Sequence, residues 1–288
     1  LYWKSLDQEG KVWFEATFEL WHFNILSFNE ECVSIDKVEA LQGILRQARA
    51  QNIHFLRDQL DSYVTTKLEF PLEWGLGTSS TLIYNVAQWA YVSPFELLEK
   101  TFGGSGYDIA CAQSFGPIIF QNLKQGPLWE TANFYPAFKD NIYFVYQNRK
   151  QNSREEISRY RALTIEQKHE AVDKINKITT ACLDCIDLKE FENLIFEHES
   201  VISKVIDKPT VQQDRYSDYW GAIKSLGAWG GDFIMVTSSK PKEEVESYFR
   251  ERGLDQILSY DELILQNFPK FSTSSEPKLE SGQALGIL

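Results

Sequence analysis

The sequence predicts an α+β protein built from two compact units. Its 288 residues exceed what one ordinary core needs, at roughly 100–200 residues per domain. Strand-like and helix-like periodicities alternate along the chain. The hydrophobic fraction of 43% is sufficient to bury a core. We place the boundary at the end of a segment that contains Gly126, Pro127 and Pro136, which gives units of residues 1–138 and 139–288.

The first unit is expected to combine a hairpin, a further strand and several helices. Residues 64–70 alternate between apolar and polar and predict a half-buried strand. Ser93, Pro94 and Glu96 have the pattern of a capping box that begins a helix ending near Lys100. The other expected elements are hairpin strands at 1–5 and 12–20, helices at 38–50, 81–90 and 107–113, a strand at 117–121, and an irregular connection at 125–139.

The second unit repeats the mixed pattern. Short apolar runs predict strands at 142–146 and 233–237. Helical spacing predicts helices at 153–160, 165–182, 188–205 and 242–252, and residues 216–224 are read as a helix or its end. A polar segment at 272–286 is expected to be a loose tail.

Charge and cysteine usage restrict the function classes. A net charge of −12 argues against a nucleic-acid partner, because phosphate backbones attract basic faces. No run of about eighteen apolar residues and no charged-then-apolar leader is seen, so neither a membrane span nor secretion is expected. Four scattered cysteines suggest a reducing compartment, hence the cytoplasm. Cys182 and Cys185 form a C-x-x-C, which we interpret as two half-buried helix residues, since a zinc site needs further ligands.

The first candidate site is the segment Gly75-Leu76-Gly77-Thr78-Ser79-Ser80. Glycines let a backbone approach an anion closely, and a helix that follows offers unpaired N–H groups at its positive end. The hydroxyl groups add donors and can ligate Mg²⁺. The segment is not the usual P-loop, because no Gly-Lys-Ser/Thr follows. Taken alone, it is equally well explained as a tight turn with a helix cap.

Two further glycine segments follow along the chain. In Gly103-Gly104-Ser105-Gly106-Tyr107-Asp108, the acid lies at an expected helix start. There its carboxylate either accepts a proton from a substrate hydroxyl or simply caps the helix. The third segment, residues 221–232, precedes an apolar strand and offers either close backbone approach or a helix C-cap with a turn.

The three segments, in this order and spacing, resemble the motifs of the GHMP kinases, the superfamily of galactokinase, homoserine kinase, mevalonate kinase and phosphomevalonate kinase. The first resembles P-x-x-x-G-L-G-S-S, with Thr78 for the first serine, and the third resembles G-A-x-K-x-x-G-A-G-G-G. The likeness covers roughly residues 63–237. Residues 104–110 and 230–232 are similar to phosphomevalonate kinase in particular, since mevalonate kinases usually carry proline at the position of Gly104.

The resemblance implies a two-lobed fold, with an N-terminal lobe like domain 2 of ribosomal protein S5 and a ferredoxin-like C-terminal lobe. It implies a kinase that uses ATP and Mg²⁺, bound between the lobes, to phosphorylate mevalonate or 5-phosphomevalonate for isoprenoid precursor synthesis. The partner would be a small anionic alcohol, and the protein a monomer or homodimer. The alternatives are a kinase for another small alcohol, such as a sugar or homoserine, and an inactive relative that binds nucleotide.

The resemblance also implies roles for single residues. Asp108 would activate the substrate hydroxyl, and Ser79 would bind phosphate and Mg²⁺ within the ATP-binding segment Gly75–Ser80. Glu96 or Glu99 would complete the metal site, although the capping box also explains Glu96. The residues expected to contact the substrate are Ser105, Gly106, Gly227, Ala228, Gly230 and Gly231.

Some features depart from the family pattern. The family's first motif, a lysine and a Gly-Glu pair, has no counterpart from Leu1 onward, which suggests a fragment or a degenerate enzyme. The start within strand-like sequence favours the fragment. Trp229 replaces a family glycine and is expected to narrow the pocket. Arg149, Lys150 and His198 lie in segments similar to family substrate regions, but a solvated basic turn and a structural histidine are the preferred interpretations.

Overall fold

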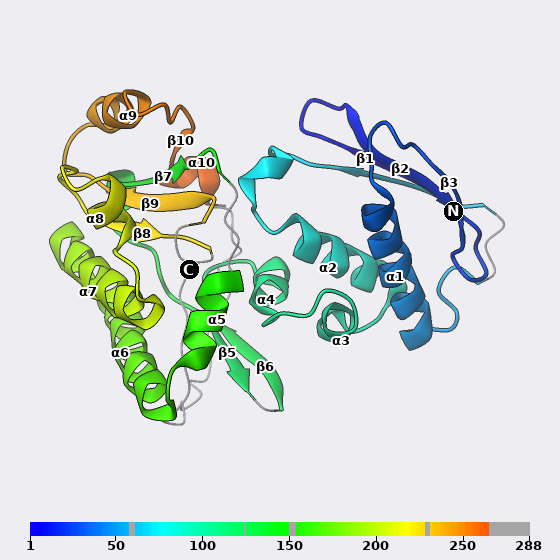
Figure 1. Cartoon of the computed structure of the whole chain (residues 1–288), viewed down its shortest axis with the longest axis horizontal. Helices are drawn as coiled ribbons and strands as arrows, with labels where there is room; N and C mark the ends of the chain where they lie inside the picture. Colours follow the sequence, from blue (N-terminus) through cyan, green and yellow to red (C-terminus); the bar gives the residue numbers. More distant parts are fainter. Residues whose placement is uncertain (58–60, 124, 150–153, 228–230, 265–288) are drawn as a thin grey trace. The chain divides into compact units, whose positions relative to one another are not determined.

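The computed structural model describes residues 1–57, 61–123, 125–149, 154–227 and 231–264. Contacts divide the chain into two units, Leu1–Gln113 and Ser114–Leu288 (Figure 1). The division lies earlier than the boundary expected from the sequence, because a hairpin after Gln113 is grouped with the second unit.

The first unit is a four-stranded sheet with helices packed against it. Its strand order is β3-β2-β1-β4, in which β1 pairs antiparallel with β2 and parallel with β4. The strands are β1 (Tyr2–Leu6), β2 (Val12–Phe18), β3 (Ile25–Phe28) and β4 (Tyr63–Lys67). The helices are α1 (Ile35–Gln51), α2 (Thr78–Ala90), α3 (Pro94–Glu99) and α4 (Tyr107–Gln113), with the short 3₁₀ helix η1 (Leu72–Trp74) before α2.

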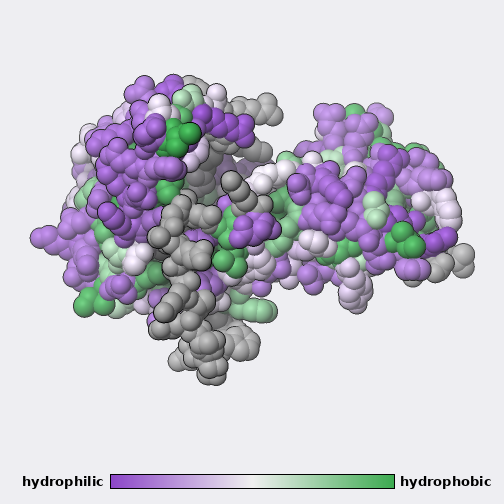
Figure 2. All heavy atoms as spheres, turned by 90° about the horizontal axis from the view of Figure 1, so that it is seen from below, coloured by the Kyte–Doolittle hydropathy of each residue, from purple (hydrophilic) through white to green (hydrophobic). Residues whose placement is uncertain are grey.

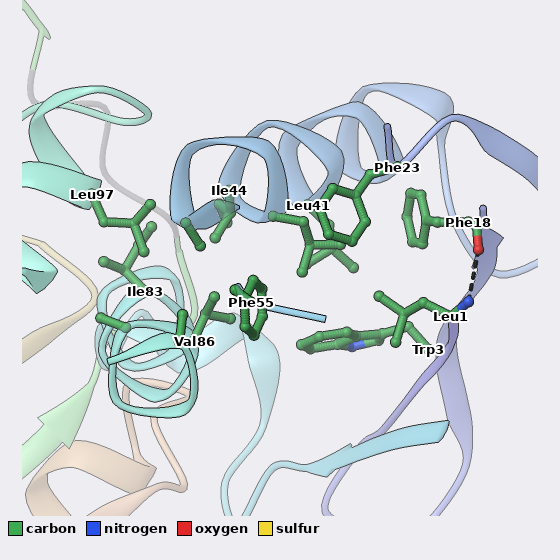
Figure 3. Close-up of a cluster of buried hydrophobic side chains, with 14 of the residues drawn as sticks. Leu1, Trp3, Phe18, Phe23, Leu41, Ile44, Phe55, Ile83, Val86 and Leu97 are labelled. Atoms are coloured by element: carbon green, nitrogen blue, oxygen red, sulfur yellow. Dashed lines mark hydrogen bonds between the residues drawn. The ribbon is translucent and has the colours of Figure 1, made fainter. Parts of the chain in front are cut away.

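The core of this unit lies between the sheet and the helices. Alternate residues of β2 are buried, so that one face of the sheet is apolar. Apolar side chains of α1 and α2 converge on that face, as Figure 3 shows for Leu41, Ile44, Ile83 and Val86. The spacing of these residues at three and four positions produces one buried stripe on each helix.

The second unit contains a hairpin and an antiparallel sheet. The hairpin pairs β5 (Ile118–Leu123) with β6 (Gly126–Thr131). The sheet has the order β10-β7-β9-β8, with β7 (Ile142–Tyr146), β8 (Ile223–Ser225), β9 (Phe233–Thr237) and β10 (Ile257–Ser259). The helices are α5 (Arg154–Ala162), α6 (Ile165–Asp184), α7 (Leu188–Ile206), α8 (Val211–Arg215), α9 (Lys242–Arg250) and α10 (Tyr260–Leu263), and the 3₁₀ helix is η2 (Lys139–Asn141).

Helices cover the sheet of the second unit. The central strand β9 is buried at every position, which explains its continuous apolar run. A core formed by Val145, Ile223, Ile234 and Val236 packs against Phe249 of α9. Helix α7 packs against α6 and against the edge strand β8 (Figure 1).

Two predictions about local structure were wrong. Residues 125–139 are not wholly irregular, because β6 occupies Gly126–Thr131. Glycine and proline obscured this strand, yet Pro127 is tolerated because both strands of a two-stranded sheet are edges. Residues 216–224 are not helical either: α8 ends at Arg215 and β8 begins at Ile223. The expected tail at 272–286 lies outside the described residues.

The face of the molecule seen in Figure 2 is mainly hydrophilic. In Figure 2 purple side chains dominate the visible face, with hydrophobic residues in smaller groups between them. Exposed large apolar residues are distributed over several elements, among them Trp21, Tyr91 and Ile186. In the part of the chain that is described, no helix combines the length and the apolar character needed to cross a membrane.

Candidate functional site

Two left-handed glycines shape the first glycine segment. Gly75 ends η1 with φ 66°, and Gly77 precedes α2 with φ 74°. A left-handed backbone conformation is unfavourable for residues with a Cβ, which explains both glycines. Thr78, Ser79 and Ser80 form the first turn of α2, so that the helix begins three residues earlier than expected.

The N-terminus of α2 is suited to an anion. Its N-cap is Gly77, which has no side chain to cap the first N–H groups, and its first turn contains no acidic residue. The first helical bond runs from the Thr81 N–H to the Gly77 carbonyl at 3.0 Å. The N–H groups before it therefore point out of the helix at the positive end of the dipole.

The second glycine segment places Asp108 on α4. Gly103, Gly104 and Gly106 have φ values of 66°, 114° and 82°. A Cβ on Gly106 would lie 2.9 Å from Cδ1 of Phe95, so this position requires glycine for space as well as for conformation. Asp108 is the second residue of α4, and α4 packs against α2.

The packing of α4 on α2 brings Asp108 to Ser80. The side chains of Ser80 and Tyr107 both hydrogen-bond to the Asp108 carboxylate, and these bonds lower its pKa. Removal of water by the surrounding protein is the larger effect, and the pKa of Asp108 is raised above its ordinary value. The residue still has an exposed surface that a ligand can reach. The result is a carboxylate of increased basicity beside the N-terminus of α2.

The pKa values of two neighbours of Asp108, Tyr107 and Cys111, are raised as well. Burial, together with the charge of Asp108, raises the pKa of Tyr107. The same two causes raise the pKa of Cys111 to about 11. Both side chains therefore stay protonated at neutral pH, and Asp108 is the group of this cluster that can accept a proton.

The remaining candidate site residues of the first unit lie near α2 and α4 or on α3. Ser79 is exposed on the first turn of α2, and Ser105 accepts a bond from the Tyr107 N–H at 3.4 Å. The expected capping box is half formed. The Ser93 hydroxyl accepts from the Glu96 N–H, whereas the Glu96 carboxylate pairs with Lys100 at 2.5 Å.

No metal cluster is found in the described ranges. They contain no group of three or more His, Cys, Asp or Glu residues arranged to hold a metal ion. The assignment of Glu96 or Glu99 as a metal ligand remains a prediction.

The third glycine segment joins β8 to β9. Gly227 is left-handed with φ 64°, and the Gly231 N–H donates to the Leu226 carbonyl at 3.1 Å. The predicted substrate residues Ala228 and Gly230, together with Trp229 and Lys150, lie outside the described residues.

Gly221, at the start of this segment, has a role that differs from the predicted C-cap. A Cβ on it would lie 2.0 Å from the Thr237 carbonyl oxygen, so close backbone packing requires glycine. The segment enters β8 from a turn, not from a helix.

Sequence reasoning missed a polar cluster on α7 and β8. His198, Glu199 and Lys224 lie within 3.6 Å of one another. The sequence interpretation of His198 is structural, and the signal available in the sequence is the spacing of Glu199, which falls four residues after Ile195 and eight after Phe191.

Comparisons with known proteins support the fold. A scan against protein-family models found no match, and a search of curated proteins found none either. Among solved structures, a Lin0012 protein from Listeria innocua is 14% identical with a TM-score of 0.59, over 89% of this chain and 84% of that chain. A mevalonate kinase is 14% identical with a TM-score of 0.57, over 89% and 84% of the two chains.

Mevalonate diphosphate decarboxylase from Staphylococcus aureus is also similar. It is 13% identical with a TM-score of 0.53, over 89% of this chain and 78% of that chain. At such identities the likeness concerns the fold alone. The chain therefore has the α+β fold of mevalonate kinase and mevalonate diphosphate decarboxylase, which confirms the GHMP kinase fold expected from the glycine segments.

Proposed function

We propose that the protein is a kinase that transfers the γ-phosphoryl group of ATP to a small anionic alcohol, namely mevalonate or 5-phosphomevalonate. The observation that carries this proposal is the contact between Ser80, on the uncapped N-terminus of α2, and the carboxylate of Asp108. One helix offers an anion site, and the other supplies a base within hydrogen-bond reach of it.

The N-terminus of α2 would bind the phosphates. Its free N–H groups and the exposed Ser79 hydroxyl are donors for phosphate oxygens. The left-handed Gly75 and Gly77 keep side chains away from the approach to these donors. Phosphoryl transfer depends mainly on such positioning and charge stabilisation, which a preorganised helix end provides.

Asp108 would act on the acceptor hydroxyl. Its raised pKa makes it a stronger base than an ordinary aspartate, while the bonds from Ser80 and Tyr107 hold the carboxylate in place. Because Tyr107 remains protonated at neutral pH, it donates to Asp108 and does not compete for the proton. The acceptor proton would pass to an oxygen of the Asp108 carboxylate.

The residues present fit a magnesium ion. Mg²⁺ commonly takes one or two carboxylates and completes its shell with substrate phosphates and water. In this proposal the Ser79 hydroxyl and the carboxylate of Glu96 or Glu99 would hold the ion, and Asp108 would remain the base. When bound, the ion would neutralise negative charge on the phosphates.

The choice of acceptor rests on motif resemblance and on the likeness to a solved mevalonate kinase. It is tested by ADP release with mevalonate, 5-phosphomevalonate, galactose and homoserine as alternative acceptors. We expect turnover with one of the first two. Turnover with galactose or homoserine alone would overturn the substrate assignment, and ATP binding without any turnover would indicate an inactive relative.

A matched pair of variants tests the assignment of Asp108. Asp36 lies in the first turn of α1 and is exposed, so Asp36→Asn removes a helix-start acid away from the proposed site. We expect this variant to keep its turnover. Asp108→Asn should lose most of its turnover and retain ATP binding.

A further inference from the structure

The ring of Phe95 in α3 lies against the start of α4. Gly103, Gly104 and Gly106, in the turn before α4, all have positive φ. A Cβ on Gly103 or Gly104 would meet no atom of the described residues within 4 Å, so both face open space. A Cβ on Gly106 would lie 2.9 Å from Cδ1 and 3.1 Å from Cε1 of Phe95. The Phe95 ring is therefore the nearest support of this turn, directly against the Cα of Gly106.

Gly106 is the residue on which the first turn of α4 closes. The first helical bond of α4 runs from the Ala110 N–H to the Gly106 carbonyl at 3.0 Å. Asp108 follows Gly106 by two residues and lies within this turn. Because the turn is closed by hydrogen bonding, a displacement of Gly106 also displaces the backbone that carries the Asp108 carboxylate.

Phe95 is itself held in place on α3. The Ser93 hydroxyl accepts from the Glu96 N–H at 3.3 Å and caps the start of this helix. The Phe95 side chain is partly buried and packs against the core of the first unit, to which α3 contributes the buried Leu97 and Leu98. In a close-packed core such a ring cannot move aside without opening a void. Phe95 can therefore act as a fixed stop for the turn before α4.

Helix α2 carries the hydrogen-bond partner of Asp108. Both α3 and α4 pack on α2, and Ser80 of α2 bonds to the Asp108 carboxylate. The separation of Ser80 and Asp108 therefore depends on where α4 begins relative to α2. Hydrogen bonds between oxygen atoms keep a narrow range of distances, about 2.5–3.0 Å. A small shift at the start of α4 is enough to break this one.

We propose that Phe95 is a positioning residue for Asp108, whose ring fixes the start of α4 and thereby keeps the Asp108 carboxylate at the Ser80 hydroxyl. Phe95 acts through Gly106 and touches neither substrate nor nucleotide. All of these residues belong to the first unit. The consequence for phosphoryl transfer rests on the proposed kinase function, whereas the effect on the bond between Ser80 and Asp108 does not.

The test is a double-mutant cycle that is read by the pKa of Asp108. Ser80→Ala removes a hydrogen bond that lowers this pKa, so the pKa should rise by up to about one unit in the otherwise wild-type protein. The same change is made in a Phe95→Val background, which lacks both ring carbons that face Gly106. A Phe102→Val background is the control for the loss of a phenyl ring, because Phe102 is 48% exposed on the connection between α3 and α4.

The pKa is measured by NMR titration of the Asp108 carboxyl carbon in protein that contains isotope-labelled aspartate, without added Mg²⁺. The Asp108 signal is the one that Asp108→Asn lacks. We expect the rise caused by Ser80→Ala to fall to about half or less in the Phe95→Val background and to persist in the Phe102→Val background. A full rise in the Phe95→Val background would overturn the proposal, as would equal losses in both backgrounds or no rise in the otherwise wild-type protein.

A second readout connects the contact to catalysis. If Asp108 is the base, a displaced carboxylate should lower kcat, and we expect a loss of about tenfold in Phe95→Val. The KM for ATP should change by less than about threefold, because the proposed phosphate donors lie on α2. Phe102→Val should leave both constants unchanged. Equal losses of kcat in the two variants would show a general effect of removing a ring and would overturn the proposal.

The outcomes separate this proposal from the proposed function. If the wild-type protein turns over no acceptor, the kinase assignment fails, and the NMR cycle still decides whether Phe95 positions Asp108. If the pKa effect is lost in Phe95→Val while kcat is unchanged, the positioning role stands and the assignment of Asp108 as the base fails. If Phe95→Val does not fold, Phe95→Leu replaces it, because leucine keeps more of the packing and lacks Cε1. A partial loss of the pKa effect then supports the proposal, and no loss refutes it.

Discussion

Substitution of Asp108 by asparagine should lower activity and raise stability together. The pKa of Asp108 is raised in the folded chain, chiefly because protein atoms displace its water. Between its ordinary pKa near 4 and this higher value, the folded state binds the proton more readily than the unfolded state. The free energy of unfolding therefore falls as pH rises through this window. Near pH 7 the wild-type protein carries the full free-energy cost of the desolvated, ionised Asp108 carboxylate. Asparagine is never charged and avoids it.

The expected gain in stability is small, because Asp108 is exposed at its surface. Each unit of pKa shift corresponds to about 1.4 kcal/mol, and solvent screening reduces the contribution at such a site to about 0.5 kcal/mol. For a protein of this length we expect a rise in Tm of about 1–2 °C at pH 7. The gain should disappear below about pH 4, where the wild-type carboxyl is protonated in both states.

The two effects are measured on the same samples, by thermal denaturation from pH 3 to pH 8 and by ADP release. Loss of a general base should lower kcat by about 10²- to 10⁴-fold. A lower Tm for Asp108→Asn at pH 7 would show that the bonds from Ser80 and Tyr107 outweigh desolvation, which would refute the electrostatic reasoning. A kcat within threefold of the wild-type value would refute the catalytic assignment.

Three further outcomes are expected. Ser80→Ala removes a hydrogen bond that lowers the pKa of Asp108, so this pKa should rise. The acidic limb of the profile of kcat/KM against pH should therefore move to higher pH by up to about one unit, and an unmoved limb would contradict the contact between Ser80 and Asp108. Gly221→Ala should destabilise the protein by about 3 kcal/mol or more in denaturant titrations, since its Cβ would clash with backbone. Gly43→Ala, in the middle of α1 with open space around it, should instead stabilise by about 0.5–1 kcal/mol, and equal effects would refute the packing argument. Cys111, with a pKa of about 11, should be alkylated at pH 8 about 100-fold more slowly in the folded than in the unfolded chain, as read by mass spectrometry.

The local sequence was sufficient to predict a helix or strand wherever one hydrophobic pattern dominated. The strands Ile142–Tyr146 and Phe233–Thr237 were predicted at their observed bounds, because each is a short apolar run buried in a sheet. The helix Tyr107–Gln113 was also predicted at its bounds, since a glycine turn marks its start. β6 was missed because Gly126 and Pro127 suppress strand propensity, whereas pairing with β5 supplies the bonds.

Hydroxyl residues at a helix start were the second source of error. The sequence predicts a helix that begins only at residue 81, because hydroxyl residues such as Thr78, Ser79 and Ser80 are typical of turns and caps. In the structure they form the first turn of α2, since Gly77 takes a left-handed conformation as the N-cap of this helix. The division after Gln113 also depended on tertiary contacts that no local pattern contains.

The sequence by itself determined the α+β class, the order of the glycine segments and the choice of Asp108, because these depend on residue type and spacing along the chain. Only the tertiary structure decided that Ser80 bonds to Asp108 and that Glu199 bonds to Ser225. Those pairs are 28 and 26 residues apart, and their contacts arise from the packing of α2 on α4 and of α7 on β8. Periodicity indicates which face of a helix is buried, but the partner that the face meets is selected by the free energy of the whole fold.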